Sequence, residues 1–224
     1  DYIRVLDRSG YFETVTLSED DLKRNDMYRA NAQRAKAQSR FADYHDYLLS
    51  LEMTAEIGDF SPLYLQRITQ LTNKSNQFNL TTKRYTAEQM EAVYNSDEYI
   101  RLYGKLYDKF GDNGVVAVTI GKTDSEDKGR LDIELWLMSC RVLKRDMELA
   151  MLDSLVAQAK KRGIREIYGH YYPTAKNKMV AGLYESFGFE KISQDEEGNT
   201  AWRLLVEGYE DKNTVIKVKE EHYA

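Results

Sequence analysis

The chain of 224 residues contains one cysteine, Cys140, so an internal disulfide and a zinc cluster built from cysteines are both excluded. Only two prolines and 13 glycines are present, which excludes collagen-like and low-complexity chains. No apolar run approaches the roughly 20 residues of a membrane span, and no signal peptide opens the chain. We therefore expect a cytoplasmic protein with no membrane partner.

An excess of basic residues is missing too. Lys and Arg number 32 against 37 Asp and Glu, a formal net charge of −5, which argues against nucleic acid as a partner. The sequence has no HExxH motif, no cysteine pair and no EF-hand pattern, so no metal site is predicted. The first residue is Asp and not Met, and we expect the chain to be part of something longer.

The composition that remains is typical of a globular chain with polar surfaces. Hydrophobic residues make up 42%, which is enough to fill a core. Tyrosines number 17, and tyrosine suits surfaces that meet a partner or line a polar pocket, because the ring is apolar and the hydroxyl is not.

The first 60 residues favour helix. Residues 1–17 suggest a short strand or an extended lead-in, and Ser18 with the acidic residues after it fits a capping box. From there to about Leu51 no Pro or Gly occurs, which predicts one long helix. Its middle, residues 29–40, has little apolar stripe, so we expect an exposed helix or one that bridges to another domain. We interpret residues 1–60 as a helical extension or linker from a missing N-terminal domain.

Residues 61–210 carry the pattern of an α/β domain. Pro62 suits the first position of a helix, and residues 86–89 form a second capping box. From Tyr99 the apolar period changes to two, which indicates strands. The predicted order is strand from 99, turn at 111–114, strands 115–120 and 131–140, helix 147–162, strand 164–170, helix 177–187, and strands near 189–193 and 201–206. Residues 211–224 are expected to be a charged tail.

This order predicts a mixed central sheet with flanking helices, in which 131–140, the helix and 164–170 form a right-handed parallel crossover. It resembles the GNAT acyltransferase fold. The resemblance implies that the two central parallel strands splay apart, that an acyl-pantetheine arm lies in the gap, and that its pyrophosphate sits on the amides opening the crossover helix. The GNAT motif there is Gln/Arg-x-x-Gly-x-Gly/Ala. Arg141 matches it, but Lys144 and Asp146 replace the small residues and hinder close approach of a phosphate.

Four separated polar motifs are more specific: residues 73–85, 110–114, 139–141 and 172–177. Together they resemble the C-terminal half of the FkbH-like proteins. That resemblance implies an N-terminal phosphatase domain of the haloacid dehalogenase type, absent here, and transfer of a glyceryl unit from 1,3-bisphosphoglycerate to an acyl carrier protein for polyketide extender units. No Asp-x-Asp motif occurs in the chain, so phosphate-ester hydrolysis by this segment is not expected.

Cys140 is the candidate nucleophile. It is expected at the C-terminal end of a central strand, before a helix N-terminus and beside Arg141, and both neighbours lower a thiol pKa. Such a thiolate can accept an acyl group and pass it to a carrier thiol. The alternative is a buried cysteine that acts as a small hydrophobe. His170 ends the neighbouring strand and is predicted to pair with Cys140 as a base, or else to be a half-exposed strand-end residue.

Three cations surround the expected helix start, namely Arg141, Lys144 and Arg145. They are predicted to hold a phosphate of the donor or of phosphopantetheine, or else to form a solvated basic loop. Asp146 is expected to cap the helix and to repel an anion at the same amides. The phosphopantetheine arm of a carrier protein, or CoA, is therefore left open as the cofactor at this point.

Further polar residues are candidates for acyl-group binding. Asn76, Gln77, Asn79 and Thr81 can recognise a polyhydroxy acyl group, or else staple the helices to the sheet through buried hydrogen bonds. By the resemblance, Asn177 and Tyr184 lie on the helix that contacts the pantetheine arm or protonates a leaving thiol. Tyr184 also completes an apolar face, and Lys176 is a phosphate contact or an exposed residue.

Three functions remain open at this point. The first is an acyltransferase domain that loads a glyceryl-type group onto a carrier-protein thiol through Cys140. The second is an acetyl-CoA-dependent N-acetyltransferase that needs no cysteine. The third is a module without catalysis that docks a carrier protein or a phosphatase domain.

Overall fold

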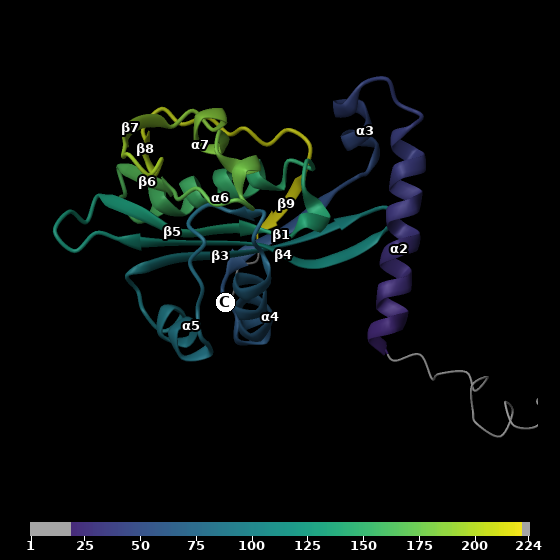
Figure 1. Ribbon diagram of the computed structural model, residues 1–224, viewed down its shortest axis with the longest axis horizontal. Coiled ribbons are helices and arrows are strands. Elements are labelled where there is room, and N and C mark those ends of the chain that lie inside the picture. The colour runs from purple at the N-terminus through teal and green to yellow at the C-terminus, as the bar shows by residue number, and fades with distance from the viewer. Residues whose placement is uncertain (1–18, 221–224) are drawn as a thin grey trace, which may run out of the picture. The chain divides into compact units, whose positions relative to one another are not determined.

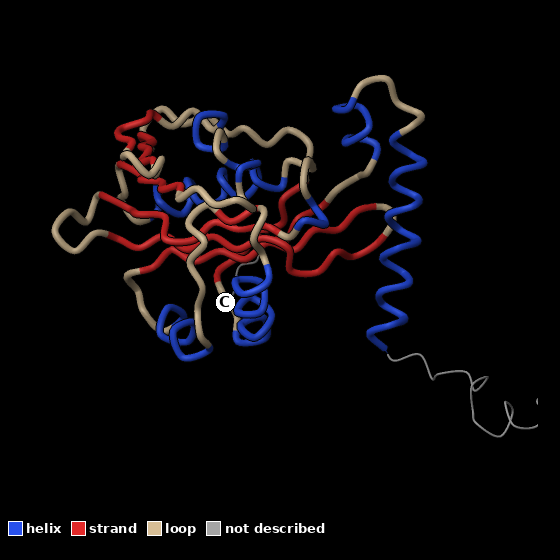
Figure 2. The backbone as a smooth tube through the Cα atoms, in the orientation of Figure 1, coloured by secondary structure: helices blue, strands red, loops and turns tan. Residues whose placement is uncertain are grey.

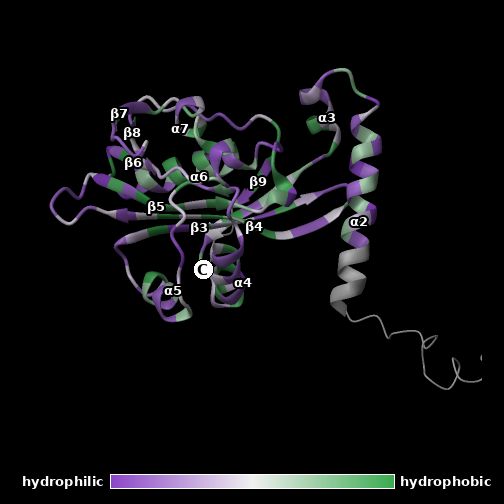
Figure 3. Cartoon of the chain, in the orientation of Figure 1, coloured by the Kyte–Doolittle hydropathy of each residue, from purple (hydrophilic) through white to green (hydrophobic). Residues whose placement is uncertain are grey.

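The computed structural model describes residues 19–220, and it divides the chain into two compact units, Asp1–Tyr44 and His45–Ala224. The described part of the first unit is helix α2 (Glu19–Gln38), in which polar residues dominate (Figure 3). The strand expected in residues 1–17 and the Ser18 cap lie outside the described residues. Across residues 19–220, every helix is too short or too polar to cross a membrane.

The single helix expected up to Leu51 is two helices, because α2 stops at Gln38 and α3 (Tyr44–Ser50) follows. The last turn of α2 tightens: the amide of Arg40 donates to the carbonyl of Ala37 at 3.0 Å. The hydroxyl of Ser39 donates to the carbonyl of Lys36 at 2.9 Å. A serine side chain that competes for backbone partners in this way ends a helix that propensity alone would continue.

Strands from most of the second unit join in a nine-stranded sheet of order β7-β8-β6-β5-β4-β3-β1-β9, with β2 paired to β5 off that path (Figures 1 and 2). The strands are β1 (Thr54–Asp59), β2 (Phe78–Asn79), β3 (Tyr99–Asp108), β4 (Gly111–Thr123), β5 (Arg130–Met138), β6 (Glu166–Tyr171), β7 (Glu190–Gln194), β8 (Thr200–Leu205) and β9 (Lys217–Glu220). The helices are α4 (Pro62–Lys74), α5 (Ala87–Tyr94), α6 (Met147–Lys161) and α7 (Leu183–Ser186), with short 3-10 turns η1 (Cys140–Val142) and η2 (Lys178–Val180).

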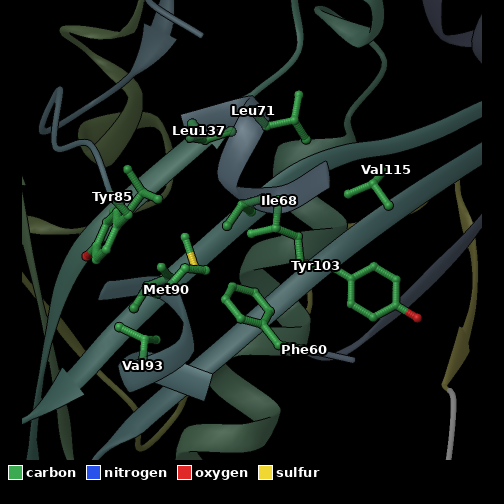
Figure 4. Close-up of a cluster of buried hydrophobic side chains, with 12 residues drawn as sticks. Phe60, Ile68, Leu71, Tyr85, Met90, Val93, Tyr103, Val115 and Leu137 are labelled. Carbon is green, nitrogen blue, oxygen red and sulfur yellow. The ribbon is translucent and has the colours of Figure 1, made fainter. Parts of the chain in front are cut away.

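Helices cover both faces of the sheet. Figure 1 shows α6 and α7 on one face and α4 and α5 on the other. Under α4 and α5 the buried cluster drawn in Figure 4 joins Ile68 and Met90 of the helices to Tyr103 and Leu137 of the strands. On the α6 face, Gly104 makes room for Met147: a Cβ at Gly104 would lie 2.3 Å from the Cε of that methionine. Burial on both faces fixes the central strands, which therefore read as nearly continuous apolar runs.

The local signals for the helix starts are confirmed. Ser61 caps α4 with Pro62 at its first position. Thr86 and Gln89 form the predicted capping box of α5, each side chain accepting the other's backbone amide. The order of strands and helices predicted from Tyr99 to Leu205 is confirmed as well, including the parallel pairing of β5 with β6.

Other expectations need correction. The turn expected at 111–114 lies earlier, at Lys109 and Phe110, because Asp108 pairs with Gly111 and β4 starts there. The helix expected over 177–187 is broken into η2 and α7. Strands β1, β2 and β9 were not predicted; β9 comes from the segment expected to be a tail and pairs in parallel with β1.

Candidate active site at the ends of strands β5 and β6

The two central parallel strands pair only near their starts. Residues 130–132 of β5 lie opposite 166–168 of β6, and the pairing stops there although β5 runs on to Met138 and β6 to Tyr171. The strands therefore separate toward their C-terminal ends, which is the place where the sequence predicted a bound acyl arm.

The chain's own residues 78–82 fill this space. Phe78 and Asn79 pair antiparallel with Met138 and Leu137 of β5. The amide of Leu80 then donates to the carbonyl of Trp136 at 3.1 Å, and the carbonyl of Leu80 accepts from the amide of Tyr172 at 3.0 Å. The segment thus hydrogen-bonds to β5 on one side and to the end of β6 on the other. We call residues 78–82 the bridging segment.

The side chains of the bridging segment turn inward. The amide nitrogen Nδ2 of Asn79 donates to the carbonyl of Ser75 at 3.3 Å, and its Oδ1 accepts from the amide of Thr82 at 2.9 Å. The hydroxyl of Thr81 donates to the carbonyl of Glu134 at 2.7 Å. All residues from Phe78 to Thr81 are buried. Asn79 and Thr81, for which the sequence left both acyl-group binding and buried stapling open, therefore spend their polar atoms inside the chain.

Asn177 locks the segment from the other side. It is fully buried, and its Nδ2 donates to the carbonyls of Asn79 at 2.9 Å and of Tyr172 at 3.0 Å. Its Oδ1 accepts from the amide of Thr174 at 2.7 Å. This use of the side chain also explains why no continuous helix begins at residue 177, since both ends of the amide organise the loop before it.

Cys140 lies on an open edge. β5 ends at Met138, and the Ser139 amide donates to the carbonyl of Val116 at 2.7 Å. Cys140 is the first residue of η1, whose N-cap is Ser139, and it is exposed. The predicted position at the C-terminal end of a central strand is therefore observed, and so is the neighbour Arg141.

Arg141, the residue after Cys140, influences a second arginine. Burial, and after it the positive charge of Arg141, lower the pKa of Arg67 on α4. A neighbouring cation disfavours the charged form of a guanidinium group, so the charge of Arg141 acts on Arg67 as well as next to Cys140 in the chain. The sequence singled out Arg141 alone, because Arg67 is more than 70 residues away along the chain and no spacing links the two.

Arg145 is placed differently from Arg141. Its Nη1 lies 3.1 Å from the Oδ2 of Asp108, whose side chain is fully buried, and its Nη2 donates to the carbonyl of Arg141 at 2.9 Å. Arg145 is itself buried. Its charge is used inside the fold to hold the 141–146 loop against the β3–β4 turn, so it is not presented to a donor phosphate.

The 141–146 loop keeps a backbone suited to glycine. Lys144 and Asp146 have φ angles of +63° and +60°, in the left-handed region. These are the two positions at which the GNAT motif has small residues, and a side chain there costs about 1 kcal/mol or more in backbone strain. Asp146 occupies the N-cap position of α6 but makes no side-chain capping bond, contrary to the capping role expected from the sequence.

Carboxylates dominate the start of α6. Burial raises the pKa of Asp146, and burial also raises the pKa of Glu148, with a further contribution from the charge of Asp146. The Oε2 of Glu148 is buried without a hydrogen-bond partner. A helix N-terminus attracts anions through its free amides, but two acids that already occupy this one oppose a second anion there.

His170 does not meet Cys140. Its Nε2 lies 3.3 Å from the Oδ1 of Asp132 on β5, and Arg130 holds the same carboxylate through two bonds of 2.8 and 2.7 Å. Although burial alone would raise it, the pKa of Asp132 is lowered, because His170 and Arg130 donate to its charged form.

Strand register separates the predicted pair. The last pair of the two strands is Asp132 with Tyr168, and His170 contacts Asp132, which is eight residues before Cys140 or roughly 26 Å along an extended chain. The predicted Cys140–His170 contact is therefore absent, and an Asp132–His170 pair is found in its place. Asp132 was missed because nothing in the sequence links it to a histidine 38 residues later.

The remaining candidate residues lie outside the bridging segment; they are Asn76, Gln77, Lys176 and Tyr184. Asn76 is partly exposed and its Oδ1 accepts from Arg84 at 2.7 Å, while Gln77 and Lys176 are exposed. Tyr184 on α7 is buried against Phe189, with ring centroids 5.0 Å apart, and burial raises the pKa of its hydroxyl. Among the described residues, no group of three or more acidic, histidine or cysteine side chains is arranged to hold a metal ion.

Known structures share this architecture. The ribosomal-protein-S18-alanine N-acetyltransferase of Escherichia coli has a TM-score of 0.52 at 13% identity over 72% of this chain and 99% of that one. The GNAT domain of PAT from S. lividans has a TM-score of 0.52 at 15% identity over 66% and 89%. The yncA protein of Salmonella typhimurium, solved with its cofactor acetyl-CoA, has a TM-score of 0.52 at 14% identity over 70% and 96%.

The chain has the GNAT acetyltransferase fold, which confirms the fold predicted from the order of its elements. No protein-family model and no curated protein matches the sequence. At identities of 13–15% the likeness establishes the fold, and a fold alone does not fix the reaction.

The acyl-CoA arm that this fold implies does not fit the residues present. The bridging segment takes backbone groups of β5 and of the end of β6 that an arm would use, and its residues 78–81 are buried between the two strands. The start of α6 carries two carboxylates where a pyrophosphate would lie. The exposed edge at Cys140 is the part of the site that remains accessible.

Proposed function

We propose that this chain is an acyltransferase domain that accepts an acyl group on Cys140 and passes it to the pantetheine thiol of an acyl carrier protein. The observation that carries the proposal is the exposed thiol of Cys140 just after the end of β5, followed directly by Arg141 in η1. A thiol placed next to fixed positive charge is a better nucleophile, because its thiolate is stabilised.

The proposed donor is an acyl phosphate of the glyceryl type, such as 1,3-bisphosphoglycerate. The thiolate of Cys140 attacks the carbonyl carbon, the bond from that carbon to the phosphate oxygen breaks, and inorganic phosphate leaves with the electron pair. The deprotonated carrier thiol then attacks the thioester, and the Cys140 thiolate is released. Arg141 stabilises the phosphate while it departs.

The partners follow from the same proposal. An acyl carrier protein presents its thiol at the open edge, with Gln77 and Lys176 as exposed polar residues, and Asn76 as a partly exposed one, that we propose contact it. A phosphatase domain of the haloacid dehalogenase type, joined before this segment, is the second partner that the FkbH-like resemblance implies.

The test is the intact mass of the full chain after incubation with 1,3-bisphosphoglycerate. We expect a stoichiometric mass increase equal to the transferred acyl group, lost in Cys140→Ser and strongly reduced in Arg141→Gln. The matched control is Arg165→Gln, whose charge pairs with Asp127 on the surface and lies away from the thiol. An unchanged mass for the wild-type chain would contradict the proposal.

The second candidate is an acetyl-CoA-dependent N-acetyltransferase. The shared fold and the Asp132–His170 pair favour it, because an imidazole held by a carboxylate is suited to take a proton from an amine. It predicts turnover with acetyl-CoA that survives Cys140→Ser and falls at least tenfold in His170→Gln. The absence of turnover with any amine acceptor would eliminate it.

The third candidate is a docking module without catalysis. Polar helix α2, in which Tyr28 is 67% exposed, favours it. It predicts that a carrier protein binds while Cys140 stays inert to iodoacetamide between neutral and alkaline pH. Stoichiometric labelling of Cys140 by iodoacetamide at neutral pH would contradict it.

A further inference from the structure

We infer that the bridging segment is an internal strand standing where a CoA thioester lies in this fold, so this chain takes a small acyl phosphate and excludes CoA. The acyl-phosphate half of this inference rests on the proposed function. The exclusion of CoA rests on geometry alone.

The first step is the hydrogen bonding of the parted strands. An extended arm between β5 and β6 needs the outward backbone groups of both strands, much as an added strand does. In this chain the carbonyl of Trp136 already accepts from Leu80, and the amide of Tyr172 already donates to the same residue's carbonyl. The groups on which an arm would depend are therefore used by the protein itself.

The second step is the volume that the side chains of the bridging segment occupy. Phe78 and Leu80 are buried, and Leu80 is fully enclosed. An arm in the same place requires these side chains to leave the core and the Asn177 amide to lose its bond to Asn79. An incoming ligand would have to replace both the apolar contacts and the buried hydrogen bonds, because a buried donor without a partner is costly.

The third step is charge at the other end of the arm. A CoA pyrophosphate at the start of α6 would meet the carboxylates of Asp146 and Glu148, and the nearby Arg145 is occupied by Asp108. A small acyl phosphate avoids both obstacles, because it needs neither the gap nor the helix N-terminus and can approach the exposed thiol directly.

The test uses the whole chain in calorimetric titrations with CoA and acetyl-CoA. We expect no saturable heat up to about 1 mM. The double variant K144G/D146G restores the small residues of the motif and still fails to bind, because the bridging segment stays in place. Saturable CoA binding by the wild-type chain, or by the double variant alone, would overturn the exclusion.

Hydrogen exchange provides a second readout that does not depend on a variant. The amides of Leu80 and Tyr172 donate across the bridging segment and are expected to exchange as slowly as those of β5. Fast exchange of both amides, or exchange that accelerates when CoA is added, would show a displaceable segment and overturn the inference. Failure of acyl loading on Cys140, with these results unchanged, would reject the proposed function but not the exclusion of CoA.

Discussion

The side of strand β5 that faces β6 and the loop that follows the C-terminal end of β5 use polar residues differently. Along the parted side facing β6, Asn79, Thr81 and Asn177 are buried and bonded within the chain. In the loop after the C-terminal end of β5, Cys140 is exposed and Arg141 follows it directly. Residue types that suit ligand binding thus fill the space between β5 and β6 in one region, whereas in the other region the side chain of Cys140 stays exposed to solvent. Burial, and not side-chain chemistry, separates the two roles.

The largest expected effect is on stability and concerns the buried ion pair of Asp108 with Arg145, which holds the loop after Cys140. Asp108→Ala leaves the buried Arg145 without its carboxylate, so we expect the free energy of unfolding to fall by about 3–5 kcal/mol. Urea denaturation measures it. The control is Asp127→Ala, which breaks a surface pair with Arg165 and is expected to cost at most about 1 kcal/mol. Equal effects of the two substitutions would mean that the buried pair has no special role.

The stability of the buried bridging segment is tested at Asn177, whose side chain holds the segment in place. Asn177→Ala removes donors to the carbonyls of Asn79 and Tyr172, and we expect a loss of about 2–4 kcal/mol, because a buried and a partly buried acceptor lose their partner. Asn76→Ala is the matched control, since that side chain bonds only at the surface, and it should change stability by less than about 0.5 kcal/mol. A small loss at Asn177 would break the contrast between the regions.

The loop before α6 gives a smaller effect of opposite sign. Lys144→Gly places glycine at a φ of +63° and is expected to be neutral or to stabilise by up to about 1 kcal/mol. Gly163→Ala, at a φ of +71° with open space around it, makes the reverse change and should cost about 1 kcal/mol. Thermal or urea unfolding of both variants tests this. Destabilisation by Lys144→Gly would show that the lysine's contacts outweigh its backbone strain.

The smallest effect is a pH dependence. Burial raises the pKa of Glu148 above its unfolded value of about 4.3, so the folded state binds the proton more tightly. The contribution of this group to stability is therefore greatest below that unfolded value and is lost as pH rises through the folded pKa. Glu148→Gln should become more stable relative to wild type as pH rises from about 4 to 7.

The matched control for this titration is Glu185→Gln, because Glu185 is exposed on α7. Its stability difference from wild type should stay constant over the same pH range. A parallel pH dependence in both variants would mean that burial at the start of α6 is not the cause.

The candidate site was predicted in part. The sequence placed Cys140 and Arg141 at a strand end before a helix, because a local change from strand to helix period marks that point. It did not separate Arg141 from Arg145. Only the fold brings Asp108 to Arg145, and only the fold lets the charge of Arg141 act on Arg67. It left Asn79 and Thr81 open between ligand binding and stapling, because the same amides and hydroxyls suit both.

The sequence by itself determined the alternation of strands and helices from Tyr99 onward, the caps of α4 and α5, and the position of Cys140, because these depend on neighbours a few residues apart. Only the tertiary structure decided that β2 enters the sheet and that His170 pairs with Asp132. Those contacts join residues some 40 to 100 positions apart, and their free energy comes from burial that exists once the sheet has formed.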